Sequence, residues 1–297
     1  MDNLFRKITI ARIEAEGYLE TPAFDDISAL FLAAFTSLGS EAKITVNEFS
    51  NQGINLVIGA VVIDLIARDR QPILPPNSII LNLEQVHLTS PWMTPSYTRL
   101  LRSFPVWDYN LRNIDRLKSD FGVNTASPVR IGYHPSMKQI VPAAVQDVDV
   151  LFYGKRSARR QHILGTMKNR GLNVVSLENV YGPERDAWIA RAKIVLNMHY
   201  YDFGGVAEIV RMSYLLSNEK AIVSEYGETT DMDEQLRQCV MAVPYDDLVQ
   251  ACLDLVHDES ARRTLSRQGY GIFSKTDQVS YLREAIALTK LPRTVNY

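Results

Sequence analysis

Apolar runs and amphipathic segments alternate along the first half of the chain, and this alternation predicts strands and helices in turn. Four runs are largely apolar rather than strictly alternating, which is typical of parallel strands that are covered on both faces. They are KITIAR from Lys7, KITVNEF from Lys43, INLVIGAVV from Ile54 and SIILNLEQ from Ser78. Helical periodicity predicts three helices, over FDDISALFLAAFTSLG, PSYTRLLRSF and NLRNIDRLKSDFG.

The same pattern restarts after PSMKQIVPAAVQ, a stretch with two prolines and no clear period that predicts a linker. Strands are expected over VDVLFYG, LNVVSLE, KIVLNMHYY, KAIVSE and CVMAVPY, and helices over SARRQHILGTMKNRG, GPERDAWIARA, AEIVRMSYLLSN and DDLVQACLDLVHD. Two such series predict an α/β protein with two Rossmann-like, doubly wound domains that face each other across a cleft. The expected domains are residues 1–136 and 137–275, with an amphipathic C-terminal segment, 276–297, crossing back onto the first domain.

Composition restricts the classes of partner and compartment. The 297 residues are 46 % hydrophobic and 22 % charged, as in ordinary globular proteins, and the formal net charge is −2. This balance favours neither nucleic acid nor an anionic membrane surface as a partner. Cys239 and Cys252 lack metal-ligand spacing, and no apolar run approaches the ~20 residues that span a bilayer. We therefore expect a cytoplasmic protein without a transmembrane segment, and the sequence does not indicate its oligomeric state.

Basic residues gather where the first strand of the second half ends, in FYGKRSARRQHIL. Ligands of doubly wound sheets bind beyond the carboxyl ends of the strands. There Gly154 allows a tight turn, and Arg156, Arg159 and Arg160 follow as a helix begins. These arginines oppose the helix dipole, so they do not stabilise the helix. They indicate either a diphosphate site or a solvated basic face. After the next strand, Tyr181 is a candidate for stacking on a base or for packing.

A second candidate loop lies in NMHYYDFGGVAEIVR, which carries His199, Gly204 and Gly205 before a helix. Glycines let a ligand approach the backbone, and a helix N-terminus suits phosphate. Glu208, near the helix start, is an acceptor for a ribose diol. Alternatively, it favours the dipole and pairs with Arg211, three residues further on.

In this order, these motifs resemble the C-terminal half of the GT-B glycosyltransferases, in particular the short family 1/4-like group. The resemblance covers about Asp149 to Ser274, and IILNLEQ, FPVWDYNLRNIDRLK and GYHPS are similar to the acceptor domain of the same group. It implies that a nucleotide-diphospho-sugar is the co-substrate. A strand–Gly–Arg turn contacts the donor diphosphate in this family, which implies that role for Gly154, Arg156, and Arg159 or Arg160.

The resemblance also implies that the loop with His199, Gly204 and Gly205 holds the phosphates and the donor sugar. Many members carry Glu-x7-Glu on the following helix, and the second Glu binds ribose. In this chain Leu216 stands eight positions after Glu208, so the two-Glu pattern is absent. Two roles remain open for Glu208: binding ribose itself, or orienting Arg211 toward a phosphate.

An inverting transferase needs a general base on the first domain, whereas a retaining enzyme does not. Glu84 and His87, at and just beyond the end of the fourth predicted strand, are the expected catalytic candidates, and Asp108 is an alternative. We interpret the two Asp-x-Asp stretches, which begin at Asp147 and Asp231, as solvated turns.

The sequence thus predicts a metal-independent glycosyltransferase without a cofactor that acts on a glycan or small-molecule acceptor. Two alternatives remain: a nucleotide-sugar-binding accessory protein without turnover, and a sugar-nucleotide epimerase.

Overall fold

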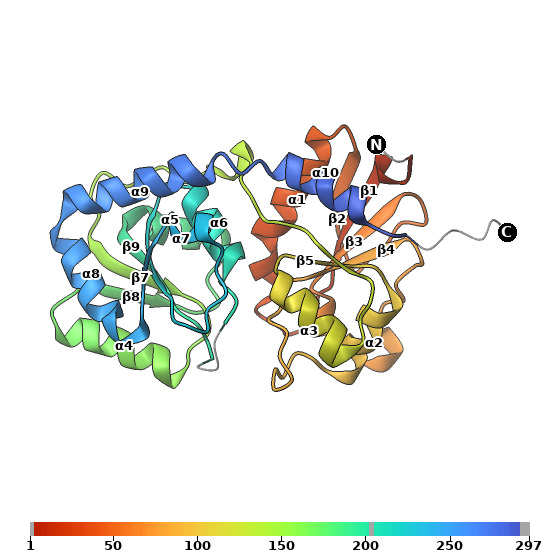
Figure 1. Ribbon diagram of the computed structural model, residues 1–297, viewed down its shortest axis with the longest axis horizontal. Coiled ribbons are helices and arrows are strands. Elements are labelled where there is room, and N and C mark those ends of the chain that lie inside the picture. Colours follow the sequence, from red (N-terminus) through yellow and green to blue (C-terminus); the bar gives the residue numbers. More distant parts are fainter. Residues whose placement is uncertain (1–2, 202–204, 292–297) are drawn as a thin grey trace. The chain divides into compact units, whose positions relative to one another are not determined.

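The structure is a computed structural model that describes residues 3–201 and 205–291 of the 297-residue chain (Figure 1). It divides into two compact units, one formed by Met1–Ile131 with Gln278–Tyr297 and the other by Gly132–Asp277. Each unit has its own parallel sheet, of six strands in unit 1 and five in unit 2, with helices on both faces. The predicted α/β class with two doubly wound domains is confirmed.

Unit 1 has the strand order β2-β1-β3-β4-β5-β6, and every pair of neighbours is parallel. Its strands are β1 (Lys7–Arg12), β2 (Glu41–Val46), β3 (Ile54–Ile58), β4 (Ser78–Asn82), β5 (Val106–Asp108) and β6 (Ala126–Pro128). Its helices are α1 (Asp25–Ser37), α2 (Pro95–Ser103), α3 (Leu111–Phe121) and α10 (Gln278–Leu288). The C-terminal helix α10 packs against α1 and β6, and Trp107 Nε1 donates to Thr289 Oγ1 over 2.7 Å.

The structure corrects several predictions in unit 1. The third predicted strand ends at Ile58 because Gly59, with φ 80°, turns the chain into the 3₁₀ helix η3 (Ala60–Leu65). The fourth ends at Asn82, before Glu84, which lies in a bend. The sequence pattern did not predict β5 and β6, because three residues are too few to display a strand period.

Unit 2 has the strand order β11-β10-β9-β7-β8, again with parallel neighbours. Its strands are β7 (Val148–Tyr153), β8 (Val174–Leu177), β9 (Ala192–Asn197), β10 (Ala221–Glu225) and β11 (Met241–Val243). Its helices are α4 (Ala158–Asn169), α5 (Gly182–Arg191), α6 (Ile209–Ser217), α7 (Glu234–Arg237), α8 (Leu248–His257) and α9 (Glu259–Phe273). The sequence pattern did not predict α9, and the helix expected from Ala207 begins at Ile209.

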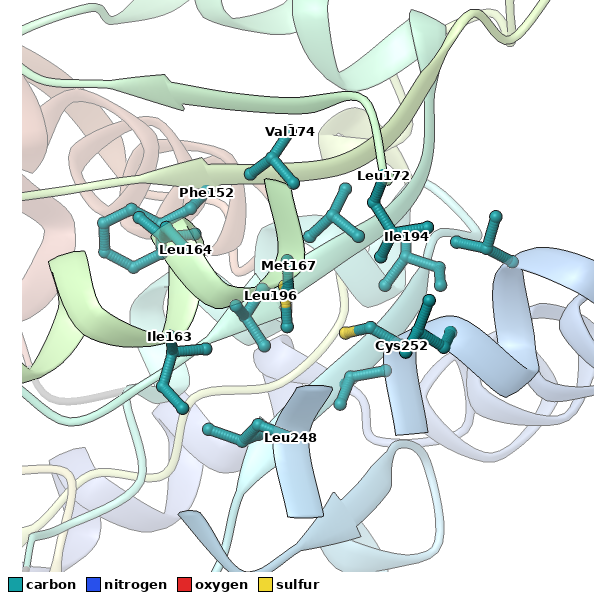
Figure 2. Close-up of a cluster of buried hydrophobic side chains, with 14 of the residues drawn as sticks. Phe152, Ile163, Leu164, Met167, Leu172, Val174, Ile194, Leu196, Leu248 and Cys252 are labelled. Atoms are coloured by element: carbon teal, nitrogen blue, oxygen red, sulfur yellow. The ribbon is translucent and has the colours of Figure 1, made fainter. Parts of the chain in front are cut away.

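One face of the unit 2 sheet packs against α4 and α8 (Figure 2). Phe152 on β7 and Leu196 on β9 meet Ile163 and Met167 of α4 and Leu248 of α8, and all five side chains are buried. This dry layer makes β7, β9 and α4 a rigid support for the loops at the carboxyl edge of the sheet.

The division into units falls at residues 131/132 and 277/278, whereas the sequence placed it at 136/137 and 275/276. The stretch interpreted as a linker lies in unit 2 because Asn218, at the end of α6, binds it. Asn218 Oδ1 accepts from the backbone N–H groups of Gln139 and Ile140 over 2.8 Å, and its Nδ2 donates to the carbonyl of Met137.

Both sheets reverse the direction of winding between two adjacent strands. In unit 1 the reversal lies between β1 and β3, and in unit 2 between β7 and β9. The chains that leave two such strands depart toward opposite faces of the sheet, which opens a crevice where ligands of doubly wound proteins bind. Among the described helices, none is long and apolar enough to cross a membrane.

Candidate active site

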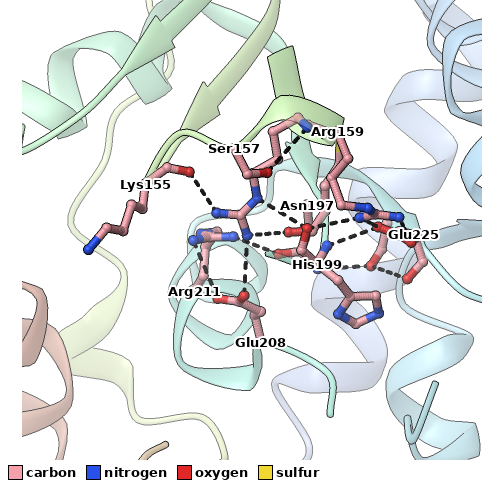
Figure 3. A network of polar contacts seen from close by, with 11 residues as sticks. Lys155, Ser157, Arg159, Asn197, His199, Glu208, Arg211 and Glu225 are labelled. Carbon is pink, nitrogen blue, oxygen red and sulfur yellow. Dashed lines mark hydrogen bonds and ion pairs between the residues drawn. The ribbon is translucent and has the colours of Figure 1, made fainter. Parts of the chain in front are cut away.

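The loops after β7 and β9 meet at the reversal point of unit 2 and bring seven of the ten predicted donor-binding residues together (Figure 3). These are Gly154, Arg159, Arg160, His199, Gly205, Glu208 and Arg211. Figure 3 labels Arg159, His199, Glu208 and Arg211. The α4 helix begins there because Ser157 caps it, accepting from the Arg160 backbone N–H over 3.4 Å.

Arg160 connects the two loops of this cluster through its hydrogen bonds. Its guanidinium donates to the carbonyl oxygens of Lys155 at 2.9 Å, His199 at 3.2 Å and Met198, and it reaches Glu208 at 3.5 Å. Only 2 % of Arg160 is exposed. Since a guanidinium has five N–H donors, almost all of its hydrogen-bonding capacity is used within the protein. Arg160 therefore ties the loop after β7 to the loop after β9.

Arg159 is fixed by Glu225, the last residue of β10. Glu225 was not among the predicted site residues. The two side chains form a bidentate pair with both N···O distances at 2.7 Å, and Arg159 also donates to the carbonyl of His199. Glu225 Oε2 accepts from the His199 backbone N–H over 2.9 Å. A carboxylate at the carboxyl end of a buried strand was the signal that would have found it.

Arg211 keeps more of its donors available. Its Nη1 donates to Asn197 Oδ1 over 2.9 Å, and its Nη2 lies 3.4 Å from Glu208 Oε2. Glu208 immediately precedes α6 and faces both Arg211 and Arg160. Gly154 has φ 140°, and a Cβ there would lie 2.9 Å from Arg211 Nη2. Glycine at this position therefore lets the guanidinium lie against the backbone.

His199 is 3 % exposed and lies beside Gly205. Its Nε2 contacts Thr230 Oγ1 at 3.2 Å, while its buried Nδ1 has no hydrogen-bond partner within the described part of the chain. A Cβ on Gly205 would lie 2.5 Å from that Nδ1, so only glycine fits without a shift. Gly204, the other predicted glycine of this loop, lies outside the described residues.

Arg156 and Tyr181 lie on the loops after β7 and β8. Arg156 pairs with Glu178, just beyond β8, over 3.1 Å, and its side chain is 60 % exposed. Tyr181 is half-buried and immediately precedes α5. Both lie on loops at the same edge of the sheet as the cluster, since each follows the carboxyl end of β7 or β8.

The cluster holds three arginines against two carboxylates, so one positive charge remains uncompensated when His199 is neutral. Burial lowers the pKa of Arg160 to about 10. The positive charges of Arg211 and Arg159 lower this pKa further, whereas the carboxylate of Glu208 acts to raise it. Burial also lowers the pKa of His199, against the pull of Glu225 and Glu208. For Glu208, burial acts to raise the pKa, but Arg211 and Arg160 outweigh it and the pKa is lowered. An anion bound here would offset the surplus charge.

The expected catalytic candidates lie in unit 1, on the loop after β4. His87 Nδ1 accepts from the backbone N–H of Thr89 over 3.2 Å and contacts its hydroxyl at 2.7 Å. In the neutral ring this leaves the proton on Nε2, so Nε2 is a donor and not a base. Glu84 is half-buried, and its backbone is held by Asn82 and Asn113.

Asp108, the alternative base, is wholly enclosed. It accepts hydrogen bonds from the side chains of Asn82 and Asn113 and from the backbone N–H of Asn110, and none of it is exposed. Through the two amides it supports the loop that carries Glu84. Burial raises the pKa of Asp108 to about 7, although these three hydrogen bonds act to lower it. Its enclosure makes it a positioning residue and not a base for a bound acceptor.

Three aspartates of the two Asp-x-Asp stretches make contacts within the protein. Asp147 pairs with Arg191, Asp149 pairs with Lys193, and Asp233 caps α7. In the described segments, no group of three His, Cys, Asp or Glu side chains is arranged to hold a metal ion.

No family model matches the chain. Two similar curated proteins are the uncharacterized proteins L140 and L137 of Acanthamoeba polyphaga mimivirus. L140 is 25 % identical over 186 residues, which are 61 % of this chain and 59 % of L140. L137 is 24 % identical over 236 residues, which are 75 % of this chain and 31 % of L137. The chain thus spans less than two thirds of the length of these relatives.

Solved structures with a similar fold include three glycosyltransferases or related synthases. The lipopolysaccharide glycosyltransferase WaaG has a TM-score of 0.58 at 9 % identity, covering 95 % of this chain and 99 % of its own. Sucrose-phosphate synthase from Thermosynechococcus elongatus has a TM-score of 0.60 at 11 % identity, and the match covers 94 % of this chain and 98 % of the synthase. The DNA-modifying β-glucosyltransferase, solved with and without uridine diphosphoglucose, has a TM-score of 0.60 at 12 % identity. The match covers 95 % of this chain and 99 % of the glucosyltransferase. The chain therefore has the GT-B fold, which confirms the fold implied by the sequence resemblance.

The packing of Arg211 on Gly154 predicts a large difference between two glycine substitutions. Gly154→Ala should destabilise the protein by about 1–3 kcal/mol, because its φ is unfavourable for alanine and the new Cβ meets the guanidinium. Gly165→Ala, in open space on α4, should instead stabilise it by about 0.5–1 kcal/mol. Urea unfolding of both variants measures the difference, and equal stabilities would contradict the contact.

The raised pKa of Asp108 predicts how its contribution depends on pH. The folded protein holds this proton up to about pH 7, whereas the ordinary pKa is 3.8, so the folded state loses stability as pH rises between these values. The cost of Asp108→Asn relative to wild type should therefore shrink by roughly 2–4 kcal/mol from pH 4 to 7.5, at about 1.4 kcal/mol per pKa unit.

The control for this measurement is Asp115→Asn, an exposed aspartate on α3. This variant shows how much the removal of one exposed carboxylate changes the free energy of unfolding at each pH, and the change for Asp108→Asn is compared with it. A cost of Asp108→Asn that does not change with pH would show that Asp108 titrates normally in the folded protein.

Proposed function

We propose that the protein is a glycosyltransferase that moves a sugar from a nucleotide-diphospho-sugar to a glycan or small-molecule acceptor, without a metal or another cofactor. The observation that carries this proposal is the arginine cluster at the reversal point of the unit 2 sheet, with its surplus positive charge. A diphosphate matches it because guanidinium groups donate paired hydrogen bonds to phosphate oxygens. The GT-B fold, which WaaG and the β-glucosyltransferase share, supports the same conclusion.

Arg211 is the arginine best placed to bind the donor phosphate. Among the described residues, Asn197 and Glu208 engage only two of its five N–H donors. Arg160, in contrast, uses its N–H donors for hydrogen bonds within the protein. The exposed Arg156 and the neutral His199 complete the set of donor ligands. Between the two roles open for Glu208, its contacts with Arg160 and Arg211 favour orienting Arg211.

In the reaction, the bond from the sugar anomeric carbon to the diphosphate breaks, and negative charge develops on the departing β-phosphate. Preorganised donors stabilise this charge in the transition state without having to reorganise. Arg211 is such a donor, because Arg160, Asn197 and Glu208 hold its surroundings in place. The positive groups perform the role that a divalent cation performs elsewhere, which is the basis for proposing metal independence.

For an inverting reaction, Glu84 would be the general base that takes the proton of the acceptor hydroxyl. It is preferred over His87, whose accepting nitrogen is engaged by Thr89, and over the enclosed Asp108. The acceptor is proposed to be other than DNA, although the β-glucosyltransferase with a similar fold modifies DNA, because the net charge of −2 does not favour a polyanion.

The protein is proposed to work in the cytoplasm. Cys239 and Cys252 are both free and buried, and burial raises the pKa of each thiol to about 12. Such thiols stay protonated and unreactive, as expected of residues kept for packing in a reducing compartment.

Release of nucleoside diphosphate from a panel of nucleotide sugars, with and without sugar acceptors, tests the proposed function. Wild type should release the diphosphate from at least one donor, equally in the presence of EDTA. Arg211→Lys keeps the charge but loses the planar fork, so donor affinity should fall roughly tenfold or more. Lys168→Ala, on the exposed far end of α4, is the control and should match wild type.

Three other outcomes would contradict the proposal. Binding of a nucleotide sugar without release of diphosphate would favour an accessory role. Conversion of the sugar to its epimer would favour an epimerase, and loss of activity in EDTA would contradict metal independence.

The role of Glu84 predicts a separation of binding from turnover. Glu84→Gln should lower the transfer rate about 10²-fold or more, since a general base contributes that much, while the donor dissociation constant stays unchanged. Glu41→Gln, an exposed residue at the opposite end of the unit 1 sheet, should have no effect. Full transfer activity in Glu84→Gln would rule out this base and favour a retaining mechanism.

A further inference from the structure

Unit 1 has a pocket of about 1200 Å³ at the carboxyl edge of its own sheet. Its walls come from the segments after β1, β2 and β3 and from the start of α2. Its charged lining residues are Glu14, Glu16, Asp64, Arg68, Arg70 and Arg99. The pocket exceeds the roughly 300–1,000 Å³ of typical small-molecule sites, so it has room for more than one sugar ring.

The position and the construction of the pocket both favour a ligand site. It lies over the reversal point between β1 and β3, where a crevice opens in a doubly wound sheet. Asn47, with φ 53°, joins the loops after β1 and β2 by reciprocal hydrogen bonds. Its Oδ1 accepts from the Glu14 N–H over 3.0 Å, and its Nδ2 donates to the Glu14 carbonyl over 2.8 Å. A non-glycine residue held in this conformation is typical of functional loops.

The acidic groups of the pocket have partners within unit 1. Glu14 pairs with Arg12 over 2.9 Å, Glu16 pairs with Arg70 over 3.2 Å, and Asp64 accepts from the hydroxyl of Thr94. Each carboxylate nevertheless retains oxygen lone pairs that can accept from ligand hydroxyls.

Unlike these carboxylates, the guanidinium groups of Arg68 and Arg99 are not held by neighbouring side chains in the described part of the chain. Within residues 3–201 and 205–291, neither has a hydrogen-bond or ion-pair partner. Of the other charged lining residues, only Asp64 has no ionic partner among the described residues, since its contact is the neutral hydroxyl of Thr94. The unpaired arginines of the lining therefore exceed its unpaired carboxylates by one. They favour an anionic group on the ligand, because a guanidinium binds phosphate and carboxylate through paired N–H donors.

We infer that this pocket binds the acceptor, and that the acceptor is a sugar that carries a phosphate or carboxylate group. Arg68 and Arg99 bind the anionic group, and Glu14, Asp64 and Asn47 accept from the hydroxyls. The pocket lining carries as many carboxylates as arginines, so its charge suits a ligand with a single acidic group better than a polyanion such as DNA. The assignment as acceptor rests on the proposed function, whereas the binding chemistry rests on the pocket alone.

Ligand-detected NMR titration of the full chain tests this inference with defined probes. These are glucose 6-phosphate, glucuronate, methyl α-glucoside, inorganic phosphate and a short single-stranded DNA. At least one of the two acidic sugars should bind about tenfold or more tightly than methyl α-glucoside and inorganic phosphate, since a charge-assisted hydrogen bond is stronger than a neutral one. The double variant Arg68→Gln, Arg99→Gln should lose this preference.

The matched control is the double variant Lys43→Gln, Lys118→Gln, which removes the same charge from exposed positions outside the pocket. It should bind the acidic sugars as wild type does. Equal binding of acidic and neutral sugars would overturn the inference, and so would unchanged binding by the Arg68, Arg99 variant. Inorganic phosphate binding as tightly as the sugars would reduce the pocket to an anion site, and preferred binding of DNA would assign it to nucleic acid.

Titration of the same samples with nucleoside diphosphates separates this inference from the proposed function. The Arg68, Arg99 variant should bind the diphosphate as wild type does, because neither residue belongs to the unit 2 site. Diphosphate binding without any preference for acidic sugars overturns the pocket assignment alone. Binding of acidic sugars that depends on Arg68 and Arg99, without diphosphate binding, keeps the sugar site and contradicts the donor function.

Discussion

The architecture of the unit 2 site depends on one buried guanidinium. Arg160 donates to the backbone carbonyls of Lys155, Met198 and His199, so a single side chain joins the loops that leave β7 and β9 in opposite directions. Carbonyl oxygens, rather than carboxylates, supply most of its partners. Glu208 offsets the charge of Arg160 only in part, because it also pairs with Arg211. A site built in this way is rigid before any ligand arrives and retains a positive potential directed at an anion.

The two units have the same reversal of winding in their sheets, but the loops beyond it differ in chemistry. Both sheets reverse their winding at one pair of strands, and in both the loops beyond those strands gather charged side chains. In unit 2 a surplus of arginine is buried against backbone and suits a diphosphate. In unit 1 the charges are largely exposed and mixed in sign, and half of them are paired, which suits a polar molecule with many hydroxyls and a single acidic group. The distinction follows from the degree of burial as much as from residue type, since burial strengthens each electrostatic contact.

Much of this arrangement could be predicted from the sequence. Gly154, Arg159, His199 and Arg211 could be placed at one edge of a sheet because alternation of strands and helices puts every strand end there. What a particular guanidinium contacts could not be predicted. Arg160 looked equivalent to Arg159, and only the fold shows that Arg160 contacts mainly carbonyls whereas Arg159 forms a bidentate pair with a carboxylate. The unit 1 pocket was also hidden, because three separate loops and the helix α2 form it and none of them has a distinctive motif.

Calorimetric titration with a nucleoside diphosphate, the matching monophosphate and the nucleoside alone tests the central claim most directly. The claim is that the uncompensated charge of the unit 2 cluster recognises the diphosphate of a nucleotide sugar. It predicts that at least one diphosphate from a panel of bases binds about tenfold or more tightly than its monophosphate, with affinity that falls as salt is added. Binding of the nucleoside as tightly as the diphosphate, or no binding of any diphosphate, would contradict the claim.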